Sequence, residues 1–189
     1  MQYRFLRYPG GKAKAVTFSY DDGCRDDIRL AKTLTEHGIR CTFNLNSGLF
    51  GKDDKAWHLT AQEIQEHIVN AGHEIAIHGK LHMAPGLSRP VDCIQDVLNC
   101  RLELEKTFGQ IVRGMAYPDS GIINLQNEAS YDNICRYLQD LGIVYARTLG
   151  GDNDKFHLPP DWMAWMPTAH HNDPEIFKLI DDFLNYKPE

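Results

Sequence analysis

The sequence predicts one α/β domain in which helices cover a largely parallel sheet. Segments rich in β-branched and aromatic residues alternate along the chain with segments whose apolar residues recur at helical spacing. Such strand–helix units favour parallel strands with outer helices. We find no repeat, low-complexity stretch or linker, which indicates a single domain over residues 1–189. A complete eight-stranded barrel typically needs ~250 residues, so this chain predicts an incomplete or distorted barrel.

The first half of the chain holds three of these units. Thr60 and Glu63 form a capping box, which begins a helix that ends at Gly72. Pro90 suits the first turn of a long helix, because an N–H there would have no partner within the helix. The expected strands are residues 15–20, 40–46 and 73–78, and the helices that follow them are residues 25–36, 60–72 and 90–108.

The second half is expected to continue the pattern with a strand at 111–116, a helix at 131–141 and a strand at 143–147. An apolar stretch at residues 162–168 then runs into the polar residues 169–173. The tail at residues 174–186 is amphipathic.

The composition is that of an ordinary globular protein, with 42% hydrophobic and 24% charged residues. No apolar run approaches the ~20 residues that span a bilayer, and the net charge of −6 gives no reason to expect nucleic acid or anionic membrane as a partner. An odd number of cysteines without a CxxC pair predicts reduced thiols. With no signal peptide at its start, the chain is expected in the cytoplasm. The five cysteines are Cys24, Cys41, Cys93, Cys100 and Cys135.

Polar clusters follow the predicted strands, at residues 21–23, 78–82 and 117–121, and a fourth follows the late apolar stretch. Singly, each has an ordinary interpretation: Asp-Asp-Gly is a common turn, and a His-x-x-x-His pair arises by chance in a chain with nine histidines. In parallel α/β folds, however, the chemistry lies at the C-terminal ends of strands. The shared position of the clusters therefore favours one functional site.

One carboxylate and two imidazoles are a standard ligand set for a divalent ion, and they leave coordination positions free for water and substrate. A second aspartate beside the ligand can take a proton from the attacking water. The sequence therefore predicts one divalent metal. Zinc is the first expectation, and cobalt, nickel or iron are the alternatives.

Two motifs carry a resemblance to a known family. Residues 17–23 (TFSYDDG) resemble the Thr-Phe-Asp-Asp-Gly motif of the polysaccharide deacetylases (carbohydrate esterase family four), with two residues inserted. Residues 78–82 (HGKLH) resemble their His-[Ser/Thr]-x-x-His motif, with Gly79 in place of the hydroxyl residue. Residues 41–46 are similar to the family's second strand. The resemblance runs in the expected order from about residue 13 to 173 and implies a distorted (β/α) barrel of about seven strands.

The resemblance also implies roles. Asp21 would be the general base, and a late histidine would protonate the leaving amine. His170 is the best match for that histidine and His171 is the alternative; strand alternation would point these neighbours to opposite faces, so we expect one of them in the site. The residues that would bind the metal are Asp22, His78 and His82.

The chain departs from the family's third motif, which reads Arg-x-Pro-Tyr-Gly. Ala116 stands where the arginine is expected, and Arg113 lies one strand pitch too early. We therefore predict that Arg147 lies within hydrogen-bond distance of Asp21, because a bidentate arginine holds a carboxylate in one rotamer. The alternative is that Arg147 is a solvated residue at a strand end.

The same departure displaces the aromatic residue that supplies a backbone N–H to the oxyanion. Tyr117 or Asp119 is expected to serve instead. Asp161 and Trp162 loosely resemble the fourth motif, in which an aspartate tunes the catalytic histidine.

The implied activity is removal of an N-acetyl group from an amino sugar or a related small amide. A small molecule or an oligosaccharide is the expected substrate. One alternative is hydrolysis of another non-peptide C–N bond, in a ureide or a cyclic imide, by the same metal site. The other alternative is a non-catalytic carbohydrate-binding scaffold, although such a scaffold would have no reason to keep base, acid and ligands together.

Overall fold

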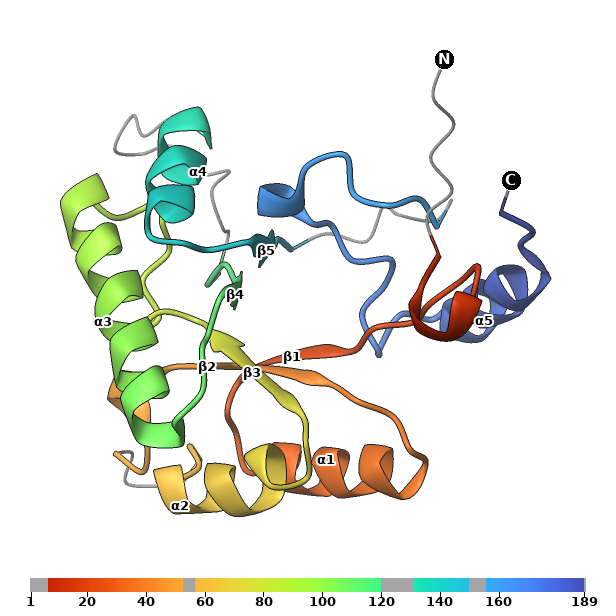
Figure 1. Ribbon diagram of the computed structural model, residues 1–189, viewed down its shortest axis with the longest axis horizontal. Helices are drawn as coiled ribbons and strands as arrows, with labels where there is room; N and C mark the ends of the chain where they lie inside the picture. The colour runs from red at the N-terminus through yellow and green to blue at the C-terminus, as the bar shows by residue number, and fades with distance from the viewer. Residues whose placement is uncertain (1–6, 53–56, 120–130, 150–155, 189) are drawn as a thin grey trace.

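The computed structural model describes residues 7–52, 57–119, 131–149 and 156–188. It shows a curled sheet with helices α1 to α4 around its outer side (Figure 1). Every neighbouring strand pair is parallel, which confirms the parallel α/β fold. Strand order in the sheet equals chain order, and the strands are β1 (Ser19–Asp22), β2 (Thr42–Leu45), β3 (Glu74–Ile77), β4 (Gly114–Ala116) and β5 (Tyr145–Arg147).

The described residues form five strands, fewer than the roughly seven that the family resemblance implied. The late apolar stretch, for example, does not become a full strand. Asp161 accepts a hydrogen bond from the Met163 N–H at 2.8 Å, which turns the next residues into the 3₁₀ helix η4 (Trp162–Ala164). Trp165 alone then pairs in parallel with Arg147 of β5.

Strand β1 lies further along the chain than expected. The sequence predicts a strand at residues 15–20, whereas β1 continues through both aspartates of the acidic motif. Asp21 pairs with Asn44 of β2 and Asp22 with Leu45, so the two carboxylates belong to the sheet edge and not to the turn after it. Because successive strand residues point to opposite faces, this register sets which way each carboxylate points.

The helices match the sequence expectation closely. The Thr60 hydroxyl accepts the Glu63 N–H at 3.2 Å, and the Glu63 carboxylate accepts the Thr60 N–H at 2.9 Å, so the capping box is confirmed. The helices are α1 (Asp26–Glu36), α2 (Ala61–Ile64), which continues as the π-helical segment η3 (Gln65–Val69), α3 (Pro90–Phe108), α4 (Tyr131–Asp140) and α5 (Ile176–Asn185).

The hydrophobic core fills the space between the sheet and helices α1 to α4. Strand residues Phe43, Leu45 and Ile77 are fully buried, and so are Ile64 and Leu104 on the facing helices. This core fixes the strands, and the strands fix the positions of the polar residues at their C-terminal ends.

The sheet curls until its two edge strands face each other. Arg147 Nε on β5 donates to Ser19 Oγ on β1 at 3.0 Å, although these strands are at opposite ends of the strand order. At the N-terminal end of the strands, the Tyr145 hydroxyl of β5 donates to the Glu74 carboxylate of β3 at 3.0 Å. Gly114 makes room for that ring, since a Cβ there would lie 2.2 Å from it. Side chains therefore bridge the interior at both ends of the incomplete barrel.

Helix α5 lies apart from the layer formed by α1 to α3, beside the N-terminal segment (Figure 1). Lys14 Nζ donates to the carbonyls of Phe183 and Leu184 at 2.8 and 2.9 Å. A cation is favourable at this position because helix C-termini carry a partial negative charge.

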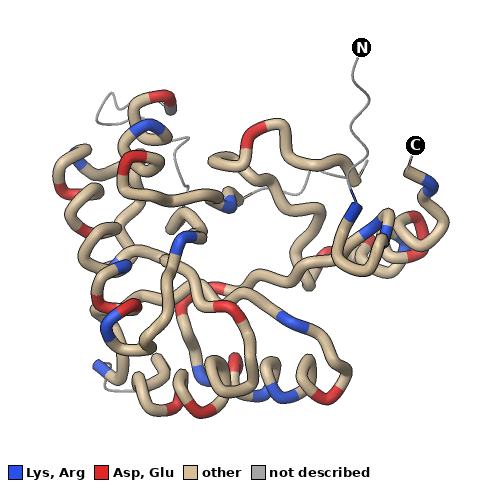
Figure 2. The backbone as a smooth tube through the Cα atoms, in the orientation of Figure 1, with Lys and Arg blue, Asp and Glu red and all other residues tan. Residues whose placement is uncertain are grey.

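Helices α1 and α3 both carry acidic and basic residues along their length (Figure 2). Within the described residues, no helix combines the length and the apolar character needed to cross a membrane. All five cysteines lie in the described part of the chain, and each is a free thiol, as predicted.

Candidate metal centre

Asp22, His78 and His82 meet at the C-terminal edge of the sheet. Asp22 is the last residue of β1, and His78 directly follows β3. Asp22 Oδ1 lies 3.5 Å from His78 Nε2 and 3.4 Å from His82 Nε2. One atom from each residue, suited to metal ligation, lies within 4.8 Å of the other two. The structure thus brings together the three residues that were expected to bind a metal.

Two of the three spacings among these atoms fit a bound divalent cation. Zinc bonds of ~2.1 Å arranged tetrahedrally place two ligand atoms about 3.4 Å apart. The two Asp22–histidine separations, 3.5 and 3.4 Å, match that edge length. Both exceed the 2.7–3.2 Å that is usual for an N–H···O hydrogen bond. The donor set therefore suits a shared ion better than direct hydrogen bonds between aspartate and histidine.

A backbone carbonyl fixes the tautomer of His78. His78 Nδ1 lies 3.0 Å from the Ala116 carbonyl oxygen, which can only accept, so this nitrogen carries the proton. Nε2 then keeps its lone pair toward Asp22. Burial lowers the pKa of the His78 imidazole against the opposing effect of the nearby Asp21 and Asp22 carboxylates. The neutral imidazole that results is the form that binds metals.

Two of the three candidate ligands have left-handed backbone. The φ angle is 78° at Asp22 and 58° at His82. A non-glycine residue in such a sparsely populated region costs about 1–3 kcal/mol, and such residues cluster at functional sites. His82 Nδ1 also lies 3.6 Å from the carboxylate of Asp119, on the side of the ring away from Asp22.

Arg147 contacts the expected general base. Its Nη2 donates to Asp21 Oδ1, which is the contact predicted from the sequence. The contact is not bidentate, because Nε donates to Ser19 and Nη1 to the Thr148 carbonyl at 3.3 Å. The Arg147 side chain is 13% exposed, so it is not a solvated strand end. Arg113, the other arginine considered, is exposed.

Sequence reasoning missed Asn44, which also holds Asp21. Asn44 Nδ2 lies 2.9 Å from Asp21 Oδ1, 2.8 Å from Ser19 Oγ and 3.1 Å from the Tyr20 carbonyl. The side chain is 1% exposed. The sequence signal for this role is an amide between two apolar strand residues, Phe43 and Leu45, because a buried amide needs a hydrogen-bond partner. Among the described contacts, the hydrogen bonds to the Asp21 side chain end on Oδ1 and not on Oδ2.

Tyr117 does not serve an oxyanion. Its backbone N–H donates to the Arg147 carbonyl at 2.9 Å, and its hydroxyl donates to the Met163 carbonyl at 2.8 Å. The side chain is also 1% exposed. Both donor groups are therefore used within the fold, and the prediction for Tyr117 is wrong. Asp119, the other residue considered for this role, borders the site next to His82.

His170 and His171 do not point to opposite faces. Their ring centroids lie 4.2 Å apart at an interplanar angle of 33°. The expectation from strand alternation is wrong because the segment forms a turn, in which the Asp173 N–H donates to the His170 carbonyl at 2.9 Å. His171 stacks on Tyr20, the neighbour of Asp21, with centroids 5.5 Å apart. His170 Nδ1 accepts the Asn172 N–H at 3.2 Å.

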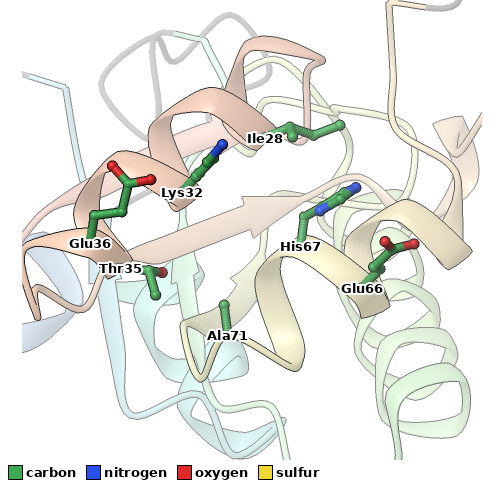
Figure 3. Close-up of a pocket in the computed structure, with 7 residues that line it drawn as sticks. All are labelled: Ile28, Lys32, Thr35, Glu36, Glu66, His67 and Ala71. Carbon is green, nitrogen blue, oxygen red and sulfur yellow. The ribbon is translucent and has the colours of Figure 1, made fainter.

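A separate hollow of about 460 Å³ lies between α1 and the helix formed by α2 and η3 (Figure 3). It contains none of the candidate site residues. Its lining mixes basic, acidic and apolar side chains, from Ile28, Lys32, Thr35, Glu36, Glu66, His67 and Ala71.

The chain resembles solved deacetylase structures. IcaB from Ammonifex degensii is 18% identical, with a TM-score of 0.72 over 94% of this chain and 76% of its own. The deacetylase PplD of Streptococcus pyogenes, in complex with acetate, is 20% identical, with a TM-score of 0.63 over 74% of this chain. A family 4 carbohydrate esterase from Streptomyces lividans, also in complex with acetate, is 13% identical, with a TM-score of 0.57 over 92% of this chain and 88% of its own. At these identities the likeness shows the shared fold.

The match with the Streptococcus pyogenes deacetylase spans only 57% of that protein's chain. No curated protein matches this chain in sequence. The family model for polysaccharide deacetylase matches residues 8–146, which include both aspartates and both histidines of the site and end just before Arg147. Because this match covers well over half of the sequence, the chain belongs to the polysaccharide deacetylase family.

Proposed function

We propose that this protein is a metal-dependent hydrolase that removes an N-acetyl group from an amino sugar or a related small amide. The observation that carries the proposal is the convergence of Asp22, His78 and His82 beside a second aspartate that Arg147 holds in place. Family membership supports N-deacetylation of sugars as the reaction class. The acetate bound to two of the similar structures supports an acetyl group as the part that is released.

Each residue of the site has its own role in the proposed reaction. A divalent cation held by Asp22, His78 and His82 would supply a Lewis acid for the amide carbonyl and the attacking water, with zinc the first expectation. Asp21 Oδ2 takes the proton of that water, while Arg147 and Asn44 keep Oδ1 fixed. His170 protonates the departing nitrogen, because an amine anion is a prohibitive leaving group. The products are acetate and a free amine.

A substrate panel tests this function. The purified protein, loaded with zinc or cobalt, is incubated with N-acetylated amino sugars, their oligomers, ureides and cyclic imides. The proposal expects acetate from an N-acetylated sugar and loss of that activity after chelation. Ammonia or ring opening from a ureide or imide would replace the deacetylase assignment with another C–N hydrolase. Sugar binding without any product would indicate a non-catalytic scaffold.

Substitution of Arg147 by lysine should lower turnover. A lysine ammonium cannot contact Asp21, Ser19 and the Thr148 carbonyl at once, so Asp21 loses its fixed orientation. Misplacement of a catalytic group by ~1 Å can cost about 10²-fold, and we expect a loss of kcat of that order. Zinc affinity should not change. Arg113→Lys, on an exposed residue, is the matched control, and an Arg147→Lys enzyme as fast as this control would exclude the role.

Single substitutions of His170 and His171 distinguish the roles of these two neighbours. Removal of a general acid typically costs about 10²–10⁴-fold. We therefore expect a loss of that size in kcat for His170→Ala and a milder effect for His171→Ala, whose ring stacks on Tyr20. The kcat values of both variants, measured with a saturating substrate, decide the matter. The reverse order would assign the acid to His171.

A further inference from the structure

The backbone between the two metal-ligand histidines is held by a carboxylate from helix α3. Asp96 Oδ2 accepts the Lys80 N–H at 2.8 Å, and Asp96 Oδ1 accepts the Leu81 N–H at 2.9 Å. The Asp96 side chain is 6% exposed. Both carboxylate oxygens are therefore committed to the segment that ends at His82, and hydrogen bonds to an ionised acceptor are roughly twice as strong as neutral ones.

Asp96 also explains the glycine that follows His78. Gly79 has a φ angle of +75°, and a Cβ at this position would lie 2.6 Å from Asp96 Oδ2. The carboxylate thus occupies the space into which a side chain at position 79 would begin. The Asp96 carboxylate can therefore take this position only because residue 79 has no side chain.

Two carbonyl groups of this segment are paired from the other side, by residues that follow β2. Asn46 Nδ2 donates to the Gly79 carbonyl at 3.0 Å, and its side chain is fully buried. The Gly48 N–H donates to the Lys80 carbonyl at 3.0 Å. The segment is therefore gripped between the end of β2 and α3, and it emerges at His82 with the left-handed φ angle of 58°. Such a backbone angle persists only where the surroundings over-determine it.

We propose that Asp96 is a positioning residue of the metal centre, which fixes residues 79–81 so that His82 Nε2 faces Asp22 and His78. The inference rests on the proposed metal site and adds a residue on α3 that the ligand motif does not contain. Asp96 acts through the two backbone N–H groups, not by contact with the ion. Because groups that orient metal ligands typically affect metal affinity 10–100-fold, the effect is measurable without any substrate.

The direct test is Asp96→Asn, which keeps the shape of the side chain but places an amide N–H₂ against a backbone N–H donor. We expect the zinc Kd, measured by competition with a chelator, to rise about 10-fold or more. The visible spectrum of the cobalt-loaded protein should also change, because it reports ligand geometry and not global stability. The control is Asp92→Asn, one turn earlier on the same helix, where the carboxylate pairs with Arg89 at the surface.

A second substitution perturbs the Asp96 carboxylate from the loop residue that faces it. Gly79→Ala should weaken zinc binding by displacing Asp96, and it serves equally well where Asp96→Asn does not fold. Its control is Gly109→Ala, because Gly109 has a similar φ angle of +64° but a Cβ there meets nothing within 4 Å. Equal loss in both glycine variants would show backbone strain alone and overturn the inference.

The outcomes separate this inference from the proposed function. If the wild-type protein binds one zinc and Asp96→Asn binds it equally tightly with an unchanged cobalt spectrum, Asp96 has no positioning role. If the wild-type protein binds no divalent metal at all, the proposed metal-dependent function fails together with the inference. Weaker binding by both Asp96→Asn and Gly79→Ala, with both controls like wild type, supports the assignment.

Discussion

Substitution of His82 by alanine is expected to abolish stoichiometric zinc binding while the protein stays folded. The imidazole supplies one of three ligands, and its side chain is 30% exposed, so its removal leaves little empty space in the core. His78→Ala should abolish zinc binding too, but at some cost in stability. That side chain is 3% exposed, and its loss leaves the buried Ala116 carbonyl without its partner, which costs about 1–3 kcal/mol.

The measurement is zinc content after dialysis, combined with circular dichroism to show that each variant is folded. His37→Ala is the matched control, because His37 is an exposed histidine at the end of α1. Full zinc content in a folded His82→Ala protein would remove His82 from the ligand set. The ion would then have to lie elsewhere.

Asp21→Asn is expected to keep zinc but lose most turnover. The asparagine carbonyl can still accept the hydrogen bonds of Arg147 and Asn44 that end on Oδ1, so the local structure should persist. Its amide nitrogen, in place of Oδ2, cannot take a proton from water. We expect kcat to fall by about 10²–10⁴-fold, the usual contribution of a general base.

Parallel assays of zinc Kd and kcat separate the two roles of the neighbouring aspartates. Asp22→Asn should weaken zinc binding, whereas Asp21→Asn should not, and Asp26→Asn on exposed Asp26 should change neither. An Asp21→Asn enzyme with wild-type turnover would show that another group acts as the base.

Much of the fold, and the meeting of the three candidate ligands at one edge of the sheet, could be predicted from simple rules. Thr60 with Glu63 marks one helix start by reciprocal hydrogen bonds, Pro90 marks another because it lacks an N–H, and the structure has both helix starts where expected. The rule that parallel strands end at a common edge brings the aspartate pair, His78 and His82 together without any knowledge of side-chain packing, and the family resemblance then implies that Asp22 and the two histidines are the ligands. Arg147 could be assigned to Asp21 because one carboxylate lacked the arginine expected at Ala116.

The errors and omissions arose where distant segments decide the outcome. Tyr117 was expected to offer an N–H to the oxyanion, but its N–H donates to β5 and its hydroxyl donates to the Met163 carbonyl. Asn44 holds Asp21 only because the register of β1 and β2 pairs them, and Asp96 reaches the histidine loop from a helix more than a dozen residues later. The error at the two late histidines is different, because it is local: strand alternation is expected there, but a turn closed by Asp173 holds the two rings side by side.

The most direct test of the account is the position of the metal itself. Crystals of the zinc-loaded protein, measured at the zinc absorption edge, give an anomalous difference map that locates the ion independently of its ligands. The account predicts one peak at ~2.0–2.2 Å from a carboxylate oxygen of Asp22 and from Nε2 of both His78 and His82. A zinc peak coordinated by other residues, or no peak at these three from a protein that holds one zinc in solution, would contradict it.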